Sequence, residues 1–339
     1  MSKSPADKAT FVARDISSLS PLNQGGSDGG YVKDQYEHHW GKKIDGLKTK
    51  IARGETLEHM IAVLRSPPHL NRGYNRVGGH PAKQMLEDFT GTHDDIPLSR
   101  LACSEGRYTV INNFDPVMAI TRLANSFTNI VELGAGPGWN LFNICTYLGN
   151  KAQARKFFGL EYSDAGIEVM KLLGDHGKLP MHATFFDYTA PDISMVPDDK
   201  PTMFFSHLSI EQVEDISGDL YEQLAARKSR TKLIHCEPIG WQRFPEMVEA
   251  RVNGDDKFFH DLIEKRLDDV RGPDAVAING ALNSWRVRYN RNTLPLLHKF
   301  EAEGKLTIQR CYYDFTHSTN VNPANPSTYV EIDFHGADA

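Results

Sequence analysis

The chain has no long apolar run among its 339 residues. No segment approaches the roughly 20 consecutive apolar residues that a membrane-spanning helix needs. No apolar stretch follows the first lysine either, so the sequence shows no secretory signal. We therefore expect a cytoplasmic protein with no membrane partner.

Cysteine and basic residues are also scarce. The four cysteines lie far apart with no CxxC pair, which argues against a zinc knuckle and against a disulfide framework. Acidic residues outnumber basic ones by 44 to 38, for a formal net charge of −6. The chain thus lacks the excess of positive charge that supports nucleic-acid binding, and we expect no nucleic-acid partner.

A hydrophobic content of 40% supplies a real core, so a globular protein is expected. Residues 1–30 are rich in Ser, Gly, Asp and Pro and are predicted to form a flexible tail. Apolar side chains recur at helical spacing in "TLEHMIAVLR", residues 56–65, and helical patterning returns around 83–89 and 115–126. These segments predict a helical cap over residues 31–120.

Beyond residue 127, short apolar runs alternate with amphipathic stretches, which is typical of strand-helix units and a mainly parallel sheet. Strands are predicted at 129–133, 156–161, 182–186, 202–207 and 232–237. A helix near 293–303 then precedes an antiparallel strand pair, "KLTIQRCYYDF" and "STYVEIDF". Ser209 and Gln212 match a capping box, which predicts a helix beginning there. The core thus spans 121–241 and 292–339.

Between the two core segments, residues 242–291 have charged helical character and are predicted to be a lid insertion. Near its end, "SWRVRYNRN" predicts a strand with Arg286 and Arg288 on one face. These arginines could hold an anionic substrate. The alternatives are a solvated face, or pairing with the acidic segment "DDKFFHDLIEKRLDD".

The stretch "NIVELGAGPGWNLFN", residues 129–143, places three glycines and a proline between an apolar run and a helix-like run. Such a turn lets the backbone approach a ligand, and the helix after it offers free amides. A dinucleotide-binding turn has the pattern G-x-G-x-x-G/A, in which the last position is a small residue. This chain has Trp139 there, so a nicotinamide enzyme is disfavoured. No G-K-S/T follows, which excludes a P-loop.

The pattern E-x-G-x-G-x-G, carried by Glu132, Gly134, Gly136 and Gly138, resembles class I S-adenosylmethionine-dependent methyltransferases. The resemblance covers about residues 127–237 and the C-terminal strand pair. It implies an α/β, Rossmann-like seven-stranded sheet with S-adenosyl-L-methionine as cofactor. It also implies that the acid ending the second strand binds the ribose and that an acid after the third faces the adenine. In this chain Glu161 ends the second predicted strand and Asp187 follows the third. The candidate cofactor-binding residues are therefore these two acids and Tyr162, Phe186 and Ser206 at strand ends beside them.

Methyl transfer to a hydroxyl or an ammonium requires removal of a proton. His207 ends the fourth predicted strand and is the leading base candidate. His235 and Glu237 are two residues apart on the fifth strand, so they share one face and could converge with His207 at the carboxyl edge. His235 is equally consistent with a hydrogen-bonded core histidine, and Glu237 with a turn-shaping role. No third ligand follows closely in sequence, so no metal is expected.

Aromatic residues of the cap, Tyr31, Tyr36 and Trp40, could line a pocket or pack in the core. The fourth strand is not followed by an N/D-P-P-Y segment, and the paired-glutamate loop of protein arginine methyltransferases is absent. We therefore expect methylation of an O or N atom of a small-molecule metabolite. A protein side-chain methyltransferase and a non-catalytic S-adenosylmethionine-binding subunit remain the alternatives. A homodimer is one assembly that the composition permits.

Overall fold

The computed structural model of the chain describes residues 29–65, 92–93, 96–97, 116–269, 273–315 and 327–335. Within these ranges no helix is both long and apolar enough to cross a membrane. Residues 1–28 of the tail predicted over 1–30, and the helical patterning predicted around 83–89, lie outside the described residues. Residues 29–30 are not part of a flexible tail but begin the helix Gly29–Ala52.

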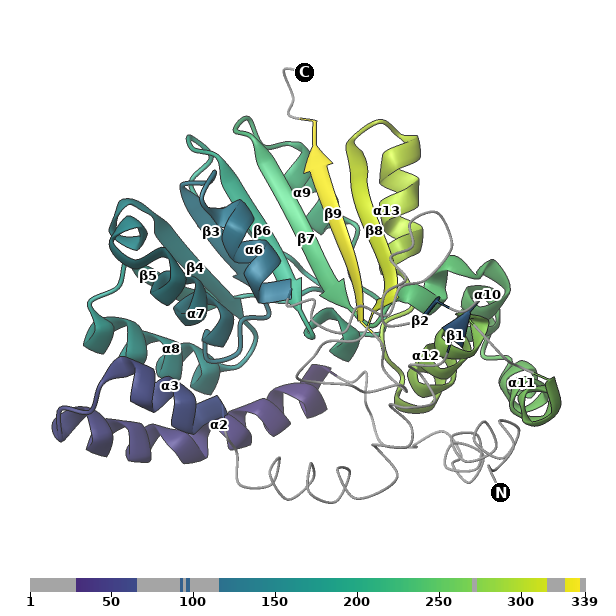
Figure 1. The fold of residues 1–339 in the computed structure, drawn as a ribbon, viewed down its shortest axis with the longest axis horizontal. Helices are drawn as coiled ribbons and strands as arrows, with labels where there is room; N and C mark the ends of the chain where they lie inside the picture. Colours follow the sequence, from purple (N-terminus) through teal and green to yellow (C-terminus); the bar gives the residue numbers. More distant parts are fainter. Residues whose placement is uncertain are drawn as a thin grey trace.

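A seven-stranded mixed sheet lies at the centre of the fold (Figure 1). Its strand order is β5-β4-β3-β6-β7-β9-β8, in which β9 runs antiparallel to both β7 and β8 and the other neighbours are parallel. The strands are β3 (Asn129–Leu133), β4 (Lys156–Glu161), β5 (Met181–Phe185), β6 (Thr202–His207), β7 (Thr231–Glu237), β8 (Leu306–Phe315) and β9 (Ser327–Phe334). A separate two-residue pair is formed by β1 (Thr92–His93) and β2 (Ile96–Pro97). The predicted class I methyltransferase architecture, with its closing antiparallel pair, is confirmed.

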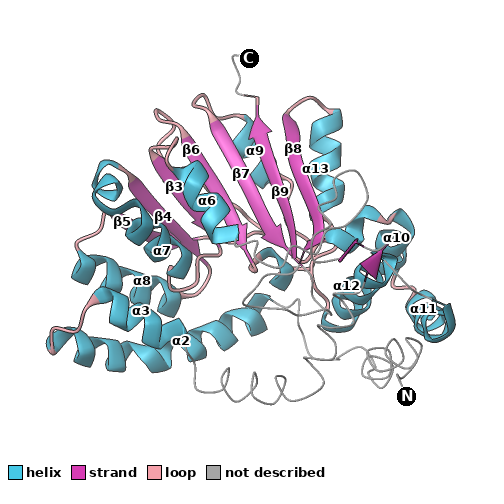
Figure 2. Cartoon of the chain, in the orientation of Figure 1, coloured by secondary structure: helices cyan, strands magenta, loops and turns pink. Residues whose placement is uncertain are grey.

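Helices cover both faces of the sheet (Figure 2). One core cluster joins the sheet to α6 (Pro116–Ala124), α7 (Trp139–Leu148) and α8 (Asp164–Gly177). A second cluster joins the opposite face to α9 (Asp219–Ala225) and α13 (Thr293–Ala302). β3 is buried along its whole length, as its apolar residues Ile130, Val131 and Leu133 favour, and it also buries Asn129 and Glu132.

Two further groups of helices lie at the carboxyl edge of the parallel strands, which is the lower edge in Figure 1. On one side α2 (Gly29–Ala52) and α3 (Leu57–Arg65) pack on α7 and α8. On the other, the insertion forms α10 (Pro245–Asn253), α11 (Asp256–Asp269) and α12 (Pro273–Val287), which share a small core of their own. The helical character predicted for the cap and the insertion is thus present in their described parts.

Two local predictions are wrong. Ser209 makes no side-chain capping bond, and only a three-residue 3-10 helix, Ile210–Gln212, follows it. Its hydroxyl donates to the carbonyl of Leu133 at 2.9 Å, so a tertiary contact replaces the capping box. The strand predicted at 285–292 is also absent, because α12 continues to Val287 and Arg288 ends it with a left-handed φ of 57°.

Candidate functional site

The glycine turn joins β3 to α7 at the carboxyl edge of the sheet. Gly134 has a φ of 67°, and a Cβ there would lie 2.5 Å from the Cβ of Ser209, so both conformation and space require glycine. Gly136 has a φ of 52° and only the Trp40 ring nearby. Its amide donates to the carboxylate of Glu161 at 2.8 Å. The turn is therefore held in shape by the acid that ends the next strand.

Glu161, at the end of β4, is only 6% exposed. Besides Gly136, its carboxylate accepts hydrogen bonds from the amide and the hydroxyl of Ser163, at 3.0 and 2.6 Å. Ser163 in turn caps α8, accepting from the Gly166 amide. The structure thus brings Glu161 against the glycine turn and fixes its orientation.

Glu132 lies inside β3 and is 1% exposed. Its Oε1 accepts a hydrogen bond of 2.6 Å from Asn140 of α7, whereas its buried Oε2 has no hydrogen-bond partner within the described chain. Burial raises the pKa of Glu132 to about 8, and the charges of Glu161 and Glu237 add to the effect. A buried acceptor without a donor costs free energy unless a ligand supplies one.

The side of the turn away from the sheet is covered by α2. Trp40 is 8% exposed, and its Cζ2 lies 3.7 Å from the Cβ position of Gly136. Its ring packs edge-on against Trp139, with centroids 5.9 Å apart, and stacks on Tyr36 at 6.5 Å. The residue that breaks the dinucleotide pattern, Trp139, thus forms part of an aromatic wall beside the glycine turn.

The residues predicted to lie near the adenine differ in their burial and in their contacts. Asp187 follows β5, and its Oδ1 accepts from the amide and hydroxyl of Thr189, both at 2.8 Å. Phe186 is 2% exposed and packs in the core against Tyr188. Tyr162 is half-buried and packs on Phe185, which is 48% exposed. Phe185 was not among the predicted site residues; because β5 ends one residue earlier than predicted, Phe185 is the surface aromatic residue at the strand end.

His235 belongs to the core. It is fully buried, and its two ring nitrogens lie 2.8 Å from the Ser206 hydroxyl and 3.1 Å from the Tyr221 hydroxyl. Burial lowers its pKa to about 3, so the imidazole is neutral. These surroundings are those of a hydrogen-bonded core histidine, which was the alternative to a catalytic role. The hydroxyl of Ser206, a predicted cofactor-binding residue, is engaged in the contact with His235.

The expected convergence of His207, His235 and Glu237 is not observed. Ser206 pairs with His235 in the register of β6 and β7, whereas His207 pairs with Cys236. Because side chains alternate between the faces of a strand, His207 and His235 leave opposite faces. His207 is partly exposed at the strand end, where a base needs to be.

Glu237 is a fully buried clamp on the turn after β6. Its carboxylate accepts from the amide of Ser209 at 3.0 Å, immediately beyond Leu208, which has a left-handed φ of 53°. Burial, reinforced by the charge of Glu211, raises the pKa of Glu237 to about 8. Since Ser209 also binds the Leu133 carbonyl, Glu237 connects the turn after His207 to the start of the glycine turn.

A polar group lies beyond the end of β6, at the 3-10 helix Ile210–Gln212. Glu211 is 7% exposed and accepts from the Gln212 amide at 3.0 Å, and that amide also reaches the Tyr289 hydroxyl at 3.5 Å. Burial together with the charges of Glu211 and Glu161 raises the pKa of Tyr36 to about 12. The charge of Glu211 thus acts on both Tyr36 from the cap and Tyr289 from the end of the insertion.

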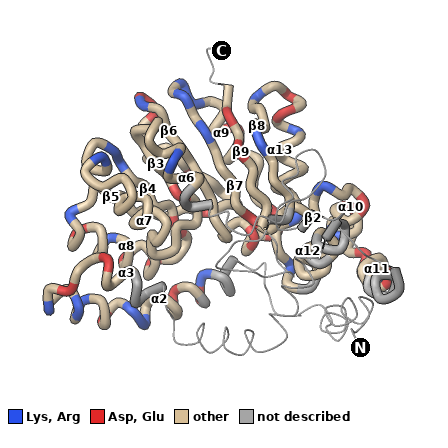
Figure 3. The backbone as a smooth tube through the Cα atoms, in the orientation of Figure 1, with Lys and Arg blue, Asp and Glu red and all other residues tan. Residues whose placement is uncertain are grey.

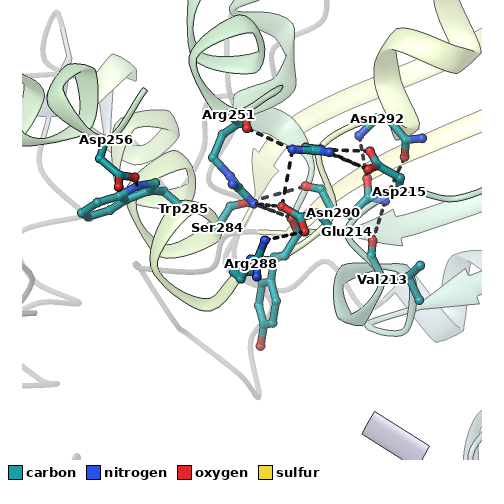
Figure 4. Close-up of polar contacts among 12 residues, drawn as sticks. Val213, Glu214, Asp215, Arg251, Asp256, Ser284, Trp285, Arg288, Asn290 and Asn292 are labelled. Atoms are coloured by element: carbon teal, nitrogen blue, oxygen red, sulfur yellow. Dashed lines mark hydrogen bonds and ion pairs between the residues drawn. The ribbon is translucent and has the colours of Figure 1, made fainter. Parts of the chain in front are cut away.

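Beside this group, an ion-pair network anchors the insertion to the loop after β6 (Figure 4). Glu214 pairs with Arg251, Arg288 and Arg291 at 3.1, 3.5 and 3.5 Å. Arg291 also pairs with Asp215 at 2.7 Å. Arg288 thus belongs to this network and not to a strand face shared with Arg286.

Figure 3 shows acidic residues near the lower ends of the central strands and basic residues in loops at the opposite edge. Three buried acids lie on strands of this sheet: Glu161 on β4, Glu132 on the neighbouring β3, and Glu237 on β7, which β6 separates from β3. In the part of the chain that the structure describes, no three His, Cys, Asp or Glu residues are grouped so as to hold a metal.

No family model matches the chain, and no curated protein matches it. Among solved structures, a geranyl diphosphate methyltransferase in complex with GPP and sinefungin is 11% identical, with 64% of this chain and 77% of that chain covered and a TM-score of 0.39. The O-methyltransferase from Bacillus cereus in complex with SAH is 11% identical, with coverage of 66% and 84% and a TM-score of 0.35. Likenesses of this size carry no weight for function, which has to be argued from the chain's own geometry.

Proposed function

We propose that the chain is a methyltransferase that binds S-adenosyl-L-methionine at the glycine turn. The observation that carries the proposal is Glu132, whose buried Oε2 has no hydrogen-bond partner in the described chain and whose charged neighbours are themselves acids. A carboxylate in such surroundings is stabilised by a cationic donor, and S-adenosylmethionine carries an ammonium and a sulfonium. The glycine turn provides the close backbone approach that such a ligand needs.

Other residues of the edge fit the remaining parts of this cofactor. Glu161, already bonded to the Gly136 amide, is positioned to accept from ribose hydroxyls. Tyr162 and Phe185 offer an aromatic surface of adenine size, and Asp187 follows directly on the same strand end. When bound, the cofactor supplies an electrophilic methyl group on sulfur.

The acceptor is proposed to be a small molecule that is methylated on oxygen or nitrogen. Its proposed site is beside Glu211, whose charge helps to raise the pKa values of Tyr36 and Tyr289. Helix α2 and the helices of the insertion lie on either side of this edge (Figure 1). His207, at the end of β6, is proposed to take the acceptor proton, while Glu237 holds the turn that follows it.

The test is turnover of S-adenosylmethionine with a panel of small alcohols, phenols, carboxylates and amines. With an accepted substrate, His207→Gln should lower turnover about 100-fold or more and leave the affinity for S-adenosylhomocysteine unchanged. His298→Gln, at a half-exposed histidine on α13, is the matched control and should have no effect. Methylation of proteins but of no small molecule would favour the protein methyltransferase, and binding without any turnover would favour the non-catalytic subunit.

A further inference from the structure

Helix α2 is fastened to the cofactor-binding half of the sheet by specific polar contacts. The carboxylate of Glu37 accepts from the backbone amides of Asp164 and Ala165 at the start of α8. Lys33 and Lys48 of the same helix pair with Asp164 and Glu168 at 3.4 and 2.9 Å. One face of α2 is therefore held in place beside the glycine turn.

Trp40 on this helix has a buried indole Nε1–H for which the described chain offers no acceptor. In an indole ring, Nε1 and Cζ2 are both bonded to Cε2 and lie on the same edge. Because Cζ2 is the atom nearest to the Cβ position of Gly136, the edge that carries the donor faces the glycine turn. Trp285, by contrast, donates its Nε1–H to Asp256 at 2.7 Å.

An unpaired acceptor lies on the same face of the sheet as Trp40, four residues before Gly136. Glu132 Oε2 has no donor in the described chain, and Asn140, which binds the other oxygen of Glu132, is adjacent in sequence to the Trp139 ring that packs on Trp40. One buried donor and one buried acceptor are thus associated with the glycine turn. An α-amino acid group offers the complement of both, because its carboxylate accepts and its ammonium donates.

The geometry points to Trp40 as the donor that binds the methionine carboxylate of the cofactor, with Glu132 accepting from the ammonium. This inference rests on the proposed function. It assigns a cofactor-positioning residue to the N-terminal cap, outside the glycine motif and the strand ends. Loss of a hydrogen bond to a charged group weakens binding about tenfold to a hundredfold.

The test compares two ligands by calorimetric titration. S-Adenosylhomocysteine carries the amino-acid group, whereas 5′-methylthioadenosine keeps the nucleoside and thioether and lacks it. Trp40→Phe should weaken S-adenosylhomocysteine binding about tenfold or more and leave methylthioadenosine binding unchanged. The control is Trp241→Phe, which removes another unpaired buried indole N–H, inside the core of the insertion, and should change neither affinity.

Equal losses for both ligands, or no loss for either, would overturn the assignment of Trp40. Failure of the wild-type protein to bind S-adenosylhomocysteine would instead overturn the proposed function. If Trp40→Phe does not fold, the indole ¹⁵N–¹H resonances of the four tryptophans in the wild-type protein provide the readout. One of them should shift with S-adenosylhomocysteine and not with methylthioadenosine, and the absence of such a shift would also overturn the inference.

Discussion

Two regions at the same edge of the sheet differ in how far their polar groups are paired. In the anchor of the insertion, Glu214 and Asp215 meet arginines at 2.7 to 3.5 Å (Figure 4). At the glycine turn, Glu132 and Trp40 each keep a buried polar atom without a partner. One buried nitrogen of the anchor, Nε of Arg251, also lacks a partner in the described chain, although its guanidinium is paired with Glu214 through Nη2. Since an unpaired buried group costs about 1–3 kcal/mol, we expect a ligand to complete the turn, where a donor and an acceptor are both unpaired. Substitutions in the anchor should therefore change stability, and those at the turn should change binding.

The largest effect is expected for Gly134→Ala. The variant forces a left-handed φ of 67° on alanine and places its Cβ 2.5 Å from Ser209. We expect a loss of about 3 kcal/mol in unfolding free energy, measured by urea denaturation, and at least a hundredfold weaker binding of S-adenosylhomocysteine. Gly46→Ala, in open space on α2, is the control and should be neutral or stabilising by up to about 1 kcal/mol. Equal stability of the two variants would contradict the account of the turn.

Glu214→Gln should be nearly as costly to stability. It removes the carboxylate from Arg251, which is 6% exposed, and uncompensated buried charges cost about 3 kcal/mol. Asp215→Asn, at a half-exposed partner, should cost less than about 1 kcal/mol. Affinity for S-adenosylhomocysteine should stay within twofold in both variants. A specific loss of affinity in folded Glu214→Gln would make the anchor part of the site.

His235→Leu separates a structural histidine from a catalytic one. It removes the hydrogen-bond partner of the Tyr221 hydroxyl and one partner of the Ser206 hydroxyl, which should cost about 2 kcal/mol. The unfolded histidine binds a proton below pH 6.5 and the folded one only near its pKa of about 3, so wild-type stability should fall as the pH is lowered between those values. Denaturation at pH 7 and pH 5 should show this slope reduced in the variant. If His235→Leu were as stable as the wild-type protein but had lost turnover, His235 would be a catalytic residue.

The smallest effect on stability is expected for Glu132→Gln. The folded pKa of Glu132 is about 8 and its ordinary value 4.5, so between these values the folded state holds a proton that the unfolded state has lost. Wild-type stability should therefore fall as the pH rises through this window, by at most about 1.4 kcal/mol per pH unit for this group. The variant should show a shallower slope between pH 6 and pH 8, with Glu237 supplying the remainder. An unchanged slope would contradict the raised pKa.

The sequence predicted the sheet well because local signals determine it. The apolar run before Gly134 and the run that ends in Glu161 become β3 and β4 at the predicted residues. The glycine turn was visible because its left-handed backbone requires glycine itself.

Predictions that depended on tertiary contacts were less successful. The Ser209 hydroxyl has a local partner in a capping box and a distant one at Leu133, and the sequence does not show which prevails. The convergence of His207 with His235 failed because the pairing of β6 and β7 sets their faces. The place of Trp40 follows from how α2 packs on α8, which no motif encodes.

The most direct test of the ligand-completed turn is calorimetric titration of the wild-type protein with S-adenosylhomocysteine near pH 7.5, in two buffers of different ionisation enthalpy. The ammonium should stabilise the charged form of Glu132, so we predict one binding site and the release of up to about one proton. Glu132→Gln should bind more weakly and release fewer protons. Absence of binding to the wild-type protein at millimolar S-adenosylhomocysteine would contradict the central claim.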